Sequence, residues 1–311
     1  MAMGPLSQEQ LRLGRIGYLN VLPIYYPLES GIVSHNFEIV SGTPSFLNGL
    51  MARGDLDLSV VSSIEYARHP ERYFILPDLS ISCRGAVKSV LLLSRNPIDQ
   101  LDGETILVSS QSHTSVALLK ILLSLFLGKK AVFEPASCTE ALERGKQPVA
   151  FLAIGDEALR LRHHPEYPYQ WDLGQVWREW TGLPFVFALW VIQRQAVERW
   201  NGRLAPAIRS LSSAKKWGRT HLNEICLQAT GENILDIEEL HAYYDCLGYN
   251  LDSDEQRGLE LFYRCLHRIE EIGEVPGLEI YSISEHSGGS FQPIERFNFP
   301  LNGAMLFNQT N

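Results

Sequence analysis

The feature that most constrains the fold of this chain is an alternation of short apolar strands and helices that begins twice. The first series lies before residue 95 and includes a helix closed by Gly54, and the second series follows a turn at Asn96-Pro97. The expected strands are 12–19, 37–42, 56–63, 105–110, 131–135 and 149–155, and the expected helices are 44–55, 114–127 and 138–145. Such alternation predicts α/β units with parallel sheets.

Two long apolar strands, 86–94 and 183–192, are predicted on either side of the second series. A chain that leaves one lobe by a strand, builds a second lobe and returns by another strand has two crossings and a cleft between the lobes. This layout predicts an α/β, two-lobed type II periplasmic-binding-protein-like fold with a central ligand cleft and two crossover strands. The expected division is 10–93 plus 190–280 for lobe I, 94–189 for lobe II and 281–311 for a C-terminal extension.

Composition excludes several classes of protein. The 311 residues carry a formal net charge of -9, which argues against a nucleic-acid partner, and no apolar run is long enough to span a membrane. Five scattered cysteines without a C-x-x-C pair, and a first segment without a secretory apolar core, predict a cytoplasmic protein with reduced thiols. Metal-ligand spacing, phosphate loops and dinucleotide fingerprints are absent, so we expect neither a metal nor a cofactor.

The first strand ends at Tyr18-Leu19-Asn20 and runs into Pro23. In parallel α/β sheets ligands bind beyond the carboxyl ends of the strands, so both Tyr18 and Asn20 are candidates for the cleft. An asparagine offers a donor and an acceptor without a charge, which suits a hydroxyl or a carboxylate. The alternative is that Asn20 caps its own loop.

The second series opens with Ser112-His113-Thr114-Ser115, immediately before an apolar helix. Free N–H groups at a helix start, together with three hydroxyls, form a cradle for a carboxylate, which lets an acidic protein hold an acidic ligand. Simple N-capping explains the same residues, and His113 is expected to face solvent. At the end of the third strand, Ser62 and Ser63 either cap a helix, in a capping box between Ser62 and Glu65, or face an anion.

Three further positions have two interpretations each. Ser89 either points into the cleft or allows close packing, and Asp156, after Gly155, either bonds a substrate hydroxyl or caps a helix. The aromatic group Trp177, Trp180 and Phe185 either walls a pocket or, as is usual, packs in the core.

Six blocks of the chain carry a family resemblance. They are RIGYLNVLP, GTPSFLNGLMARGDLDLSVVSSIEYAR, LPDLSISCRGAVKSVLLLS, SSQSHTSVALLKILL, IGDEAL and WTGLPFVFALW. In this order they resemble the chorismate dehydratase family of the futalosine route to menaquinone, closely over residues 12–195 and more loosely beyond. The sister family, dihydroxynaphthoate synthase, opens with a Ser-Pro-Cys-Pro-Asn type of motif where this chain has Tyr18-Leu19-Asn20.

The resemblance implies a cytoplasmic, cofactor-independent hydro-lyase that converts chorismate to 3-[(1-carboxyvinyl)oxy]benzoate and water. It implies Asn20 as the residue closest to the chemistry, and Ser112, Thr114 and Ser115 as an anion cradle. The residues expected to bind substrate are Tyr18, Ser62, Ser63, Ser89, Ser112, Thr114, Ser115, Gly155 and Asp156. Arg84 and His113 receive no role.

No general base stands out in the sequence, so we hypothesise that the enolpyruvyl carboxylate of the substrate takes the ring proton. The rival interpretations are the sister synthase, a solute-binding protein, and a non-catalytic module that binds an aromatic acid. A monomer and a homodimer are both compatible with the sequence.

Overall fold

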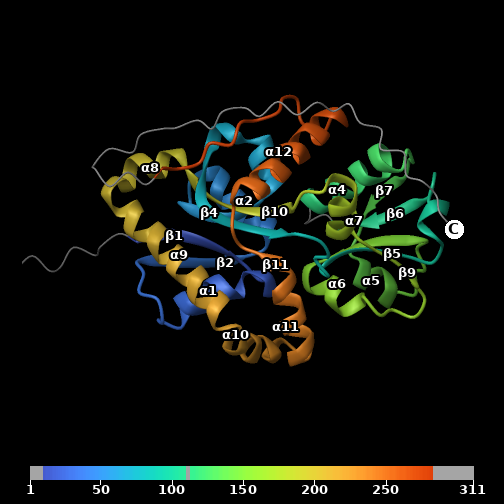
Figure 1. The fold of residues 1–311 in the computed structure, drawn as a ribbon, viewed down its shortest axis with the longest axis horizontal. Coiled ribbons are helices and arrows are strands. Elements are labelled where there is room, and N and C mark those ends of the chain that lie inside the picture. The colour runs from blue at the N-terminus through green and yellow to red at the C-terminus, as the bar shows by residue number, and fades with distance from the viewer. Residues whose placement is uncertain (1–9, 110–112, 283–311) are drawn as a thin grey trace, which may run out of the picture.

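The structure is a computed structural model that describes residues 10–109 and 113–282, and it contains two β-sheets, one in each of two lobes (Figure 1). The first sheet, in lobe I, holds β1 (Leu11–Ile16), β2 (Phe37–Gly42), β3 (Leu58–Ser62), β4 (Tyr73–Cys83), β10 (Phe185–Gln193) and β11 (Leu247–Gly248), in the order β11-β4-β10-β3-β1-β2. The second, in lobe II, holds β5 (Val90–Ser94), β6 (Thr105–Val108), β7 (Val132–Pro135), β8 (Ala150–Ile154) and β9 (Tyr169–Asp172), in the order β7-β6-β8-β5-β9.

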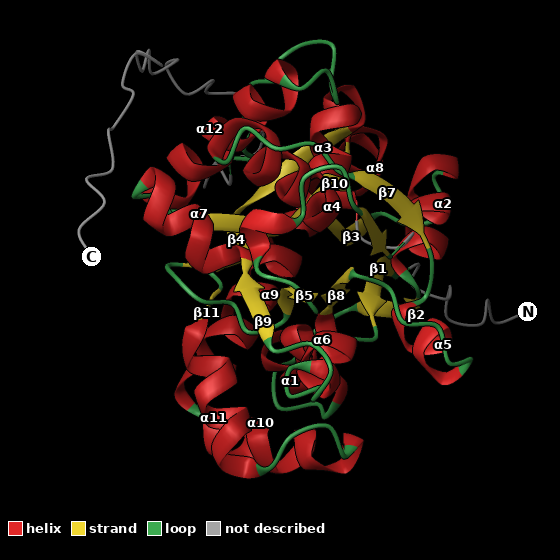
Figure 2. Ribbon diagram, turned by 90° about the vertical axis from the view of Figure 1, so that its right-hand side faces the viewer, coloured by secondary structure: helices red, strands yellow, loops and turns green. Residues whose placement is uncertain are grey.

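Helices surround both sheets, with the strands in the middle of the molecule (Figure 2). Those before the second sheet are α1 (Leu22–Glu29), α2 (Pro44–Arg53) and α3 (Ser63–Arg68). The second series contributes α4 (His113–Ile121), extended by a π-helical turn at Leu122–Phe126, and α5 (Cys138–Glu143), α6 (Gly155–Leu161) and α7 (Leu173–Thr181). After β10 come α8 (Arg194–Trp200), α9 (Leu204–Thr220), α10 (Leu222–Ala229), α11 (Ile237–Cys246) and α12 (Ser253–Arg268).

Parallel pairing gathers strand ends at one edge of each sheet. β1 pairs in parallel with β2 and β3, and β6 pairs in parallel with β7 and β8. The carboxyl ends of these strands therefore lie together, which is where ligands bind in parallel α/β sheets. All six strands and the three helices expected in the two series are present, with ends shifted by a few residues.

The chain changes sheet in the segments that flank the two long predicted strands. β5 lies wholly in the second sheet and β10 wholly in the first, where it runs antiparallel to β3 and β4. The crossings therefore fall between Cys83 and Val90 and between Asp172 and Phe185, a few residues before the expected boundaries at 93/94 and 189/190.

Strand β4 was not expected, because Pro77 and Asp78 interrupt its apolar run. The backbone of Asp78 has φ 54, in the left-handed region, and the pairing of β4 with β10 shifts register. A bulge of this kind lets the strand continue through residues that break the sequence pattern.

Local signals set several helix ends. The Thr43 hydroxyl accepts a hydrogen bond from the Phe46 N–H at the start of α2, Pro44 occupies the first turn, and Gly54 ends the helix with φ 78. At the start of α11 the Asp236 and Glu239 side chains form a reciprocal capping box. These ends follow from residues adjacent in sequence.

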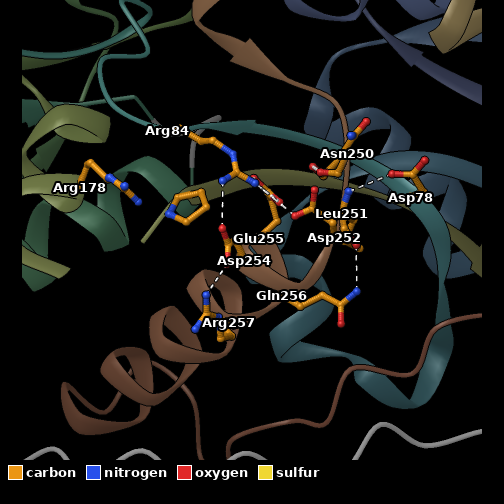
Figure 3. A network of polar contacts seen from close by, with 12 residues as sticks. Asp78, Arg84, Arg178, Asn250, Leu251, Asp252, Asp254, Glu255, Gln256 and Arg257 are labelled. Atoms are coloured by element: carbon orange, nitrogen blue, oxygen red, sulfur yellow. Dashed lines mark hydrogen bonds and ion pairs between the residues drawn. The ribbon is translucent and has the colours of Figure 1, made fainter. Parts of the chain in front are cut away.

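The first crossing segment is held to the start of α12 by Arg84 (Figure 3). Its guanidinium lies 2.8 Å from Glu255 Oε1, 3.2 Å from Asp252 Oδ1 and 3.0 Å from Asp254 Oδ2. The Glu255 side chain is only 3% exposed, and burial, followed by the neighbouring Asp252 carboxylate, raises its pKa to about 7. Arg84, left without a role by the sequence, is thus an ion-pair partner outside the cavity described below.

Glu255 gives a pH-dependent contribution to stability. An acid whose pKa is higher in the folded than in the unfolded chain makes the folded state less stable as pH rises through the folded pKa, here about 7. Glu255→Gln removes this titration, so the free energy of unfolding of the variant relative to the unsubstituted protein is expected to rise by about 1–2 kcal/mol between pH 5.5 and 8. Urea unfolding at the two pH values measures the difference.

The matched control is Glu238→Gln, at an exposed position in the first turn of α11. Its unfolding free energy relative to the unsubstituted protein is expected to be the same at both pH values. A pH-independent difference for Glu255→Gln would contradict the assigned titration.

Candidate active site

A cavity of about 750 Å³, counted with the open space at its mouth, lies between the two lobes. Lobe I contributes residues from the ends of β1 and β3 and from α2 and β10, and lobe II contributes residues beside β5, β8 and α4. The polar residues that line it are Tyr18, Asn20, Asn48, Ser62, Ser89, Thr114 and Ser115. Among the described lining residues none carries a carboxyl, imidazole or cationic side chain, so the lining has no formal charge.

Asn20 lies in a 3-10 turn (Leu19–Val21) that follows β1 and leads directly into α1. Its side-chain Oδ1 is buried and has no hydrogen-bond partner within the described chain. Buried polar atoms in native proteins are nearly always hydrogen-bonded. An unpartnered acceptor beside a cavity therefore indicates a position where a ligand donor is expected.

The expected contact of Asp156 with substrate stays a prediction, and Asp156 does not cap α6, whose N-cap residue is Ile154. Its Oδ1 accepts a hydrogen bond of 3.2 Å from the Leu19 N–H across the two lobes, and it does not line the cavity. Burial raises the pKa of this carboxyl, and the hydrogen bond from Leu19 opposes the rise. Asp156 thus fixes the turn that carries Asn20.

Ser89 and Gly155 form the opposite wall and are joined by a 2.7 Å hydrogen bond from the Gly155 N–H to the Ser89 carbonyl. Gly155 has φ +54, and a Cβ there would lie 3.1 Å from the Tyr18 ring, so glycine permits this ring to approach. Burial, and then the nearby Asp156, raises the pKa of the Tyr18 phenol, which keeps it protonated. Tyr18 therefore enters the cavity as a neutral side chain.

The start of α3 is capped from the other lobe. Thr114 Oγ1 accepts a hydrogen bond of 3.1 Å from the Ile64 N–H and lies 3.4 Å from Ser63 Oγ. Ser63 Oγ in turn donates to the Val186 carbonyl at 2.8 Å, and Ser63 does not line the cavity. Thr114 therefore lines the cavity and joins α4 to α3 at the same time.

The expected capping box of Ser62 and Glu65 is wrong. The Ser62 side chain makes no capping hydrogen bond, and Glu65 Oε1 instead accepts from the Tyr73 hydroxyl at 3.3 Å. Thr114, from the other lobe, supplies the acceptor for the Ile64 N–H at the start of α3. The Ser62 hydroxyl is therefore not used in capping and lines the cavity.

The other residues singled out in the sequence are the serines and His113 around the start of α4 and the aromatic group. Ser112 lies outside the described residues, whereas Ser115 is buried in the cavity wall. His113 is exposed, as expected. The aromatic group behaves as a core: Trp177 and Phe185 are buried, and Trp177 donates its ring N–H to the Pro184 carbonyl.

The cavity residues that were missed in the sequence include Asn48 and Phe187. Asn48 lies four residues after Pro44 on α2, and both line the cavity, as i and i+4 positions on one helix face do. Phe187 is partly buried, whereas the other residues of β10 are buried. The i, i+4 spacing is the signal that would have found Asn48, and the continuous apolar sequence of β10 offers no such signal for Phe187.

A family model described as menaquinone biosynthesis matches residues 11–268. The chain belongs to the menaquinone biosynthesis family. Two curated relatives named chorismate dehydratase, from Thermus thermophilus and Campylobacter jejuni subsp. jejuni, are each 30% identical to it, over 273 and 261 residues. These alignments cover 82% and 81% of this chain and 94% and 95% of the relatives.

The fold is that of the periplasmic binding proteins, as the sequence predicted. The periplasmic aliphatic sulphonate binding protein of Escherichia coli superposes with a TM-score of 0.65 at 14% identity, covering 97% of this chain and 100% of that one. At this identity the likeness concerns architecture alone. Within residues 10–109 and 113–282, no cluster of three or more metal-ligating side chains occurs, and no helix is long and apolar enough to cross a membrane.

Proposed function

We propose that this protein is a chorismate dehydratase, converting chorismate to 3-[(1-carboxyvinyl)oxy]benzoate and water for menaquinone biosynthesis. The observation that carries the proposal is the unpartnered, buried Oδ1 of Asn20 at the wall of a neutral cavity, in a chain related over most of its length to two proteins of that name. Chorismate carries a ring hydroxyl, the kind of donor that this acceptor lacks.

The reaction removes a proton from the ring carbon that bears the ether and the hydroxyl from the neighbouring carbon, and the ring becomes aromatic. The Asn20 amide can accept from the hydroxyl through Oδ1, while its N–H groups are available to the leaving oxygen. Donors aimed at developing charge stabilise a transition state more than they stabilise the bound substrate. Asn20 is therefore proposed as the catalytic residue.

The two carboxylates of chorismate are proposed to be held by neutral donors. Ser62, Ser89, Thr114 and Ser115 supply hydroxyls. α4 begins at His113, beside Thr114 and Ser115, and its first N–H groups carry the positive end of the helix dipole. Neutral hydrogen-bond donors explain how a chain of net charge -9 accepts a dianion without a cation among its described lining residues.

The enolpyruvyl carboxylate of the substrate itself is proposed to take the ring proton and to pass it to the departing hydroxyl group, which leaves as water. Support comes from the described lining, which offers no acid or histidine, and from Asp156, whose Oδ1 is bonded to Leu19. An intramolecular base held in a reactive conformer can lower a barrier by about 7–11 kcal/mol in favourable cases. The role of the protein is then to fix that conformer and to exclude water.

No cofactor enters this scheme, because aromatisation drives the reaction and every atom that moves belongs to the substrate. We also propose a cytoplasmic location. It is supported by five free cysteines, including Cys83, Cys138, Cys226 and Cys265, which are buried as unpaired thiols. Free thiols persist in reducing compartments.

The test is to incubate the purified, metal-free protein with chorismate and to follow the products by chromatography with mass detection. A product lighter than chorismate by one water is expected, and heat-denatured protein is the control. An analogue without the side-chain carboxylate is expected to bind without being dehydrated.

Chorismate that binds saturably and is returned intact would contradict the proposal and indicate an aromatic-acid-binding protein. Absence of binding, with turnover of cyclic futalosine, would indicate the sister synthase. Dehydration of the analogue at the normal rate would contradict only the substrate-assisted step.

A further inference from the structure

Three buried tyrosines from one C-terminal segment make hydrogen bonds to residues on both walls of the cavity. Tyr243 and Tyr244 lie at the end of α11 and Tyr249 follows β11, and we call them the tyrosine cluster. Each is at most 2% exposed, and none lines the cavity. Their hydroxyls therefore form hydrogen bonds to residues of the cavity walls from the side that faces away from the cavity.

Two members of the tyrosine cluster hold the turn that carries Asn20. The Tyr244 hydroxyl donates to the Leu19 carbonyl at 3.1 Å, and the Tyr249 hydroxyl donates to the Asn20 carbonyl at 2.8 Å. With the Leu19 N–H bonded to Asp156, the backbone on both sides of the Asn20 side chain is fixed. The amide therefore has a defined direction even though Oδ1 has no partner within the described chain.

The third member acts on the opposite wall. The Tyr243 hydroxyl donates a hydrogen bond of 3.2 Å to Ser89 Oγ, and this donor lies on the side of Ser89 that faces away from the cavity. Among the described residues, the Ser89 hydroxyl donates only one long hydrogen bond, with 3.4 Å between its Oγ and the Val87 carbonyl oxygen. It is thus available to an oxygen of a bound ligand.

Burial is the main cause that raises the pKa of all three phenols. The three phenols therefore stay protonated at neutral pH and serve as hydrogen-bond donors. Because α11 and β11 place them together, one short segment spans the distance between Asn20 and Ser89.

We propose that the tyrosine cluster positions Asn20 and Ser89 for the dehydration, with Tyr249 and Tyr244 acting through the Asn20 turn and Tyr243 through the Ser89 hydroxyl. These are positioning residues, since they reach the site only through other groups. The inference rests on the proposed function, whose reaction supplies the readout.

The test combines each tyrosine with the residue through which it acts. Tyr249→Phe is expected to lower kcat about tenfold with KM changed less than twofold, and to lower it less than twofold in a protein that already carries Asn20→Ala. Tyr243→Phe acts through Ser89, which is proposed to hold a substrate carboxylate, so it is expected to lower kcat/KM about tenfold, and less than twofold in a protein that already carries Ser89→Ala. The crossed pair, Tyr249→Phe with Ser89→Ala, is expected to be additive, because the two act on different walls.

The control is Tyr167→Phe, which removes a hydroxyl that donates to the Pro148 carbonyl at 3.1 Å from a fully buried tyrosine elsewhere in lobe II. It is expected to change thermal stability as the other Tyr→Phe variants do and to leave kcat unchanged. Two results would overturn the inference: equal losses in kcat for Tyr249→Phe with and without Asn20→Ala, or a kcat for Tyr249→Phe and a kcat/KM for Tyr243→Phe that match the control.

The two tyrosines are independent tests, so failure of one variant to fold leaves the other decisive. Chorismate left unchanged by the unsubstituted protein would overturn the proposed function together with this inference. Normal turnover by the unsubstituted protein and by both Tyr→Phe variants would overturn the inference alone.

Discussion

Asn20→Ala is expected to lower kcat for chorismate dehydration by about 10²–10³-fold, the effect of removing one preorganised side-chain donor from a transition state. KM is expected to change much less, because the amide acts on the leaving oxygen rather than on the carboxylates that hold the substrate. Since Oδ1 is buried without a partner in the described chain, its removal costs the folded state little, and Tm is expected to stay the same or to rise. Steady-state rates and a melting curve measure both effects.

Two variants sharpen this experiment. Asn36→Ala, at an exposed position before β2, is the control and is expected to retain full activity. Asn20→Asp keeps the shape of the side chain but places a negative charge beside a dianionic substrate, so it is expected to raise KM as well as to lower kcat. Turnover by Asn20→Ala within twofold of the unsubstituted rate would show that another residue carries the chemistry.

Gly218→Ala is expected to lower the free energy of unfolding by about 3 kcal/mol, at the upper end of the usual effect of overpacking. Gly218 lies in α9, where a Cβ would be 1.8 Å from the Pro23 carbonyl oxygen of α1. A backbone atom cannot rotate away as a side chain can, so the two helices must separate. Urea unfolding measures the loss, and Tm is expected to fall by several degrees.

The separation of α1 from α9 in this variant is also expected to move residues of the active site. α1 begins at Leu22, two residues after Asn20, so a shift of α1 moves the turn that carries the amide. Gly218→Ala is therefore expected to lower kcat as well as stability, even at a temperature where the variant is folded. Gly231→Ala is the matched control, because a Cβ there meets nothing within 4 Å. Equal unfolding free energies for the two variants would contradict the close packing of α1 on α9.

Local patterns predicted the parts of the fold that depend on neighbours in sequence. The strand at 37–42 and the helix that Gly54 closes appear where expected, because alternation, capping and glycine chemistry act over a few residues. β4 was missed because Pro77 and Asp78 break its pattern, and its place in the sheet is set by pairing with β10, about a hundred residues away in the chain. The two long strands were found, but only sheet pairing decided in which lobe each one lies.

The sequence by itself determined the family, the two-lobed fold and the candidates for substrate contact, Asn20 and Ser89. Strand ends and ordered motif blocks consist of contiguous residues, so they can be recognised without the structure. Only the tertiary structure decided what those candidates touch. Thr114 caps α3 from the other lobe, Asp156 bonds the Leu19 N–H, and the tyrosine cluster reaches both walls. Each of these contacts joins residues at least 50 positions apart, and a hydrogen bond over that separation depends on how the elements pack, which no local pattern specifies.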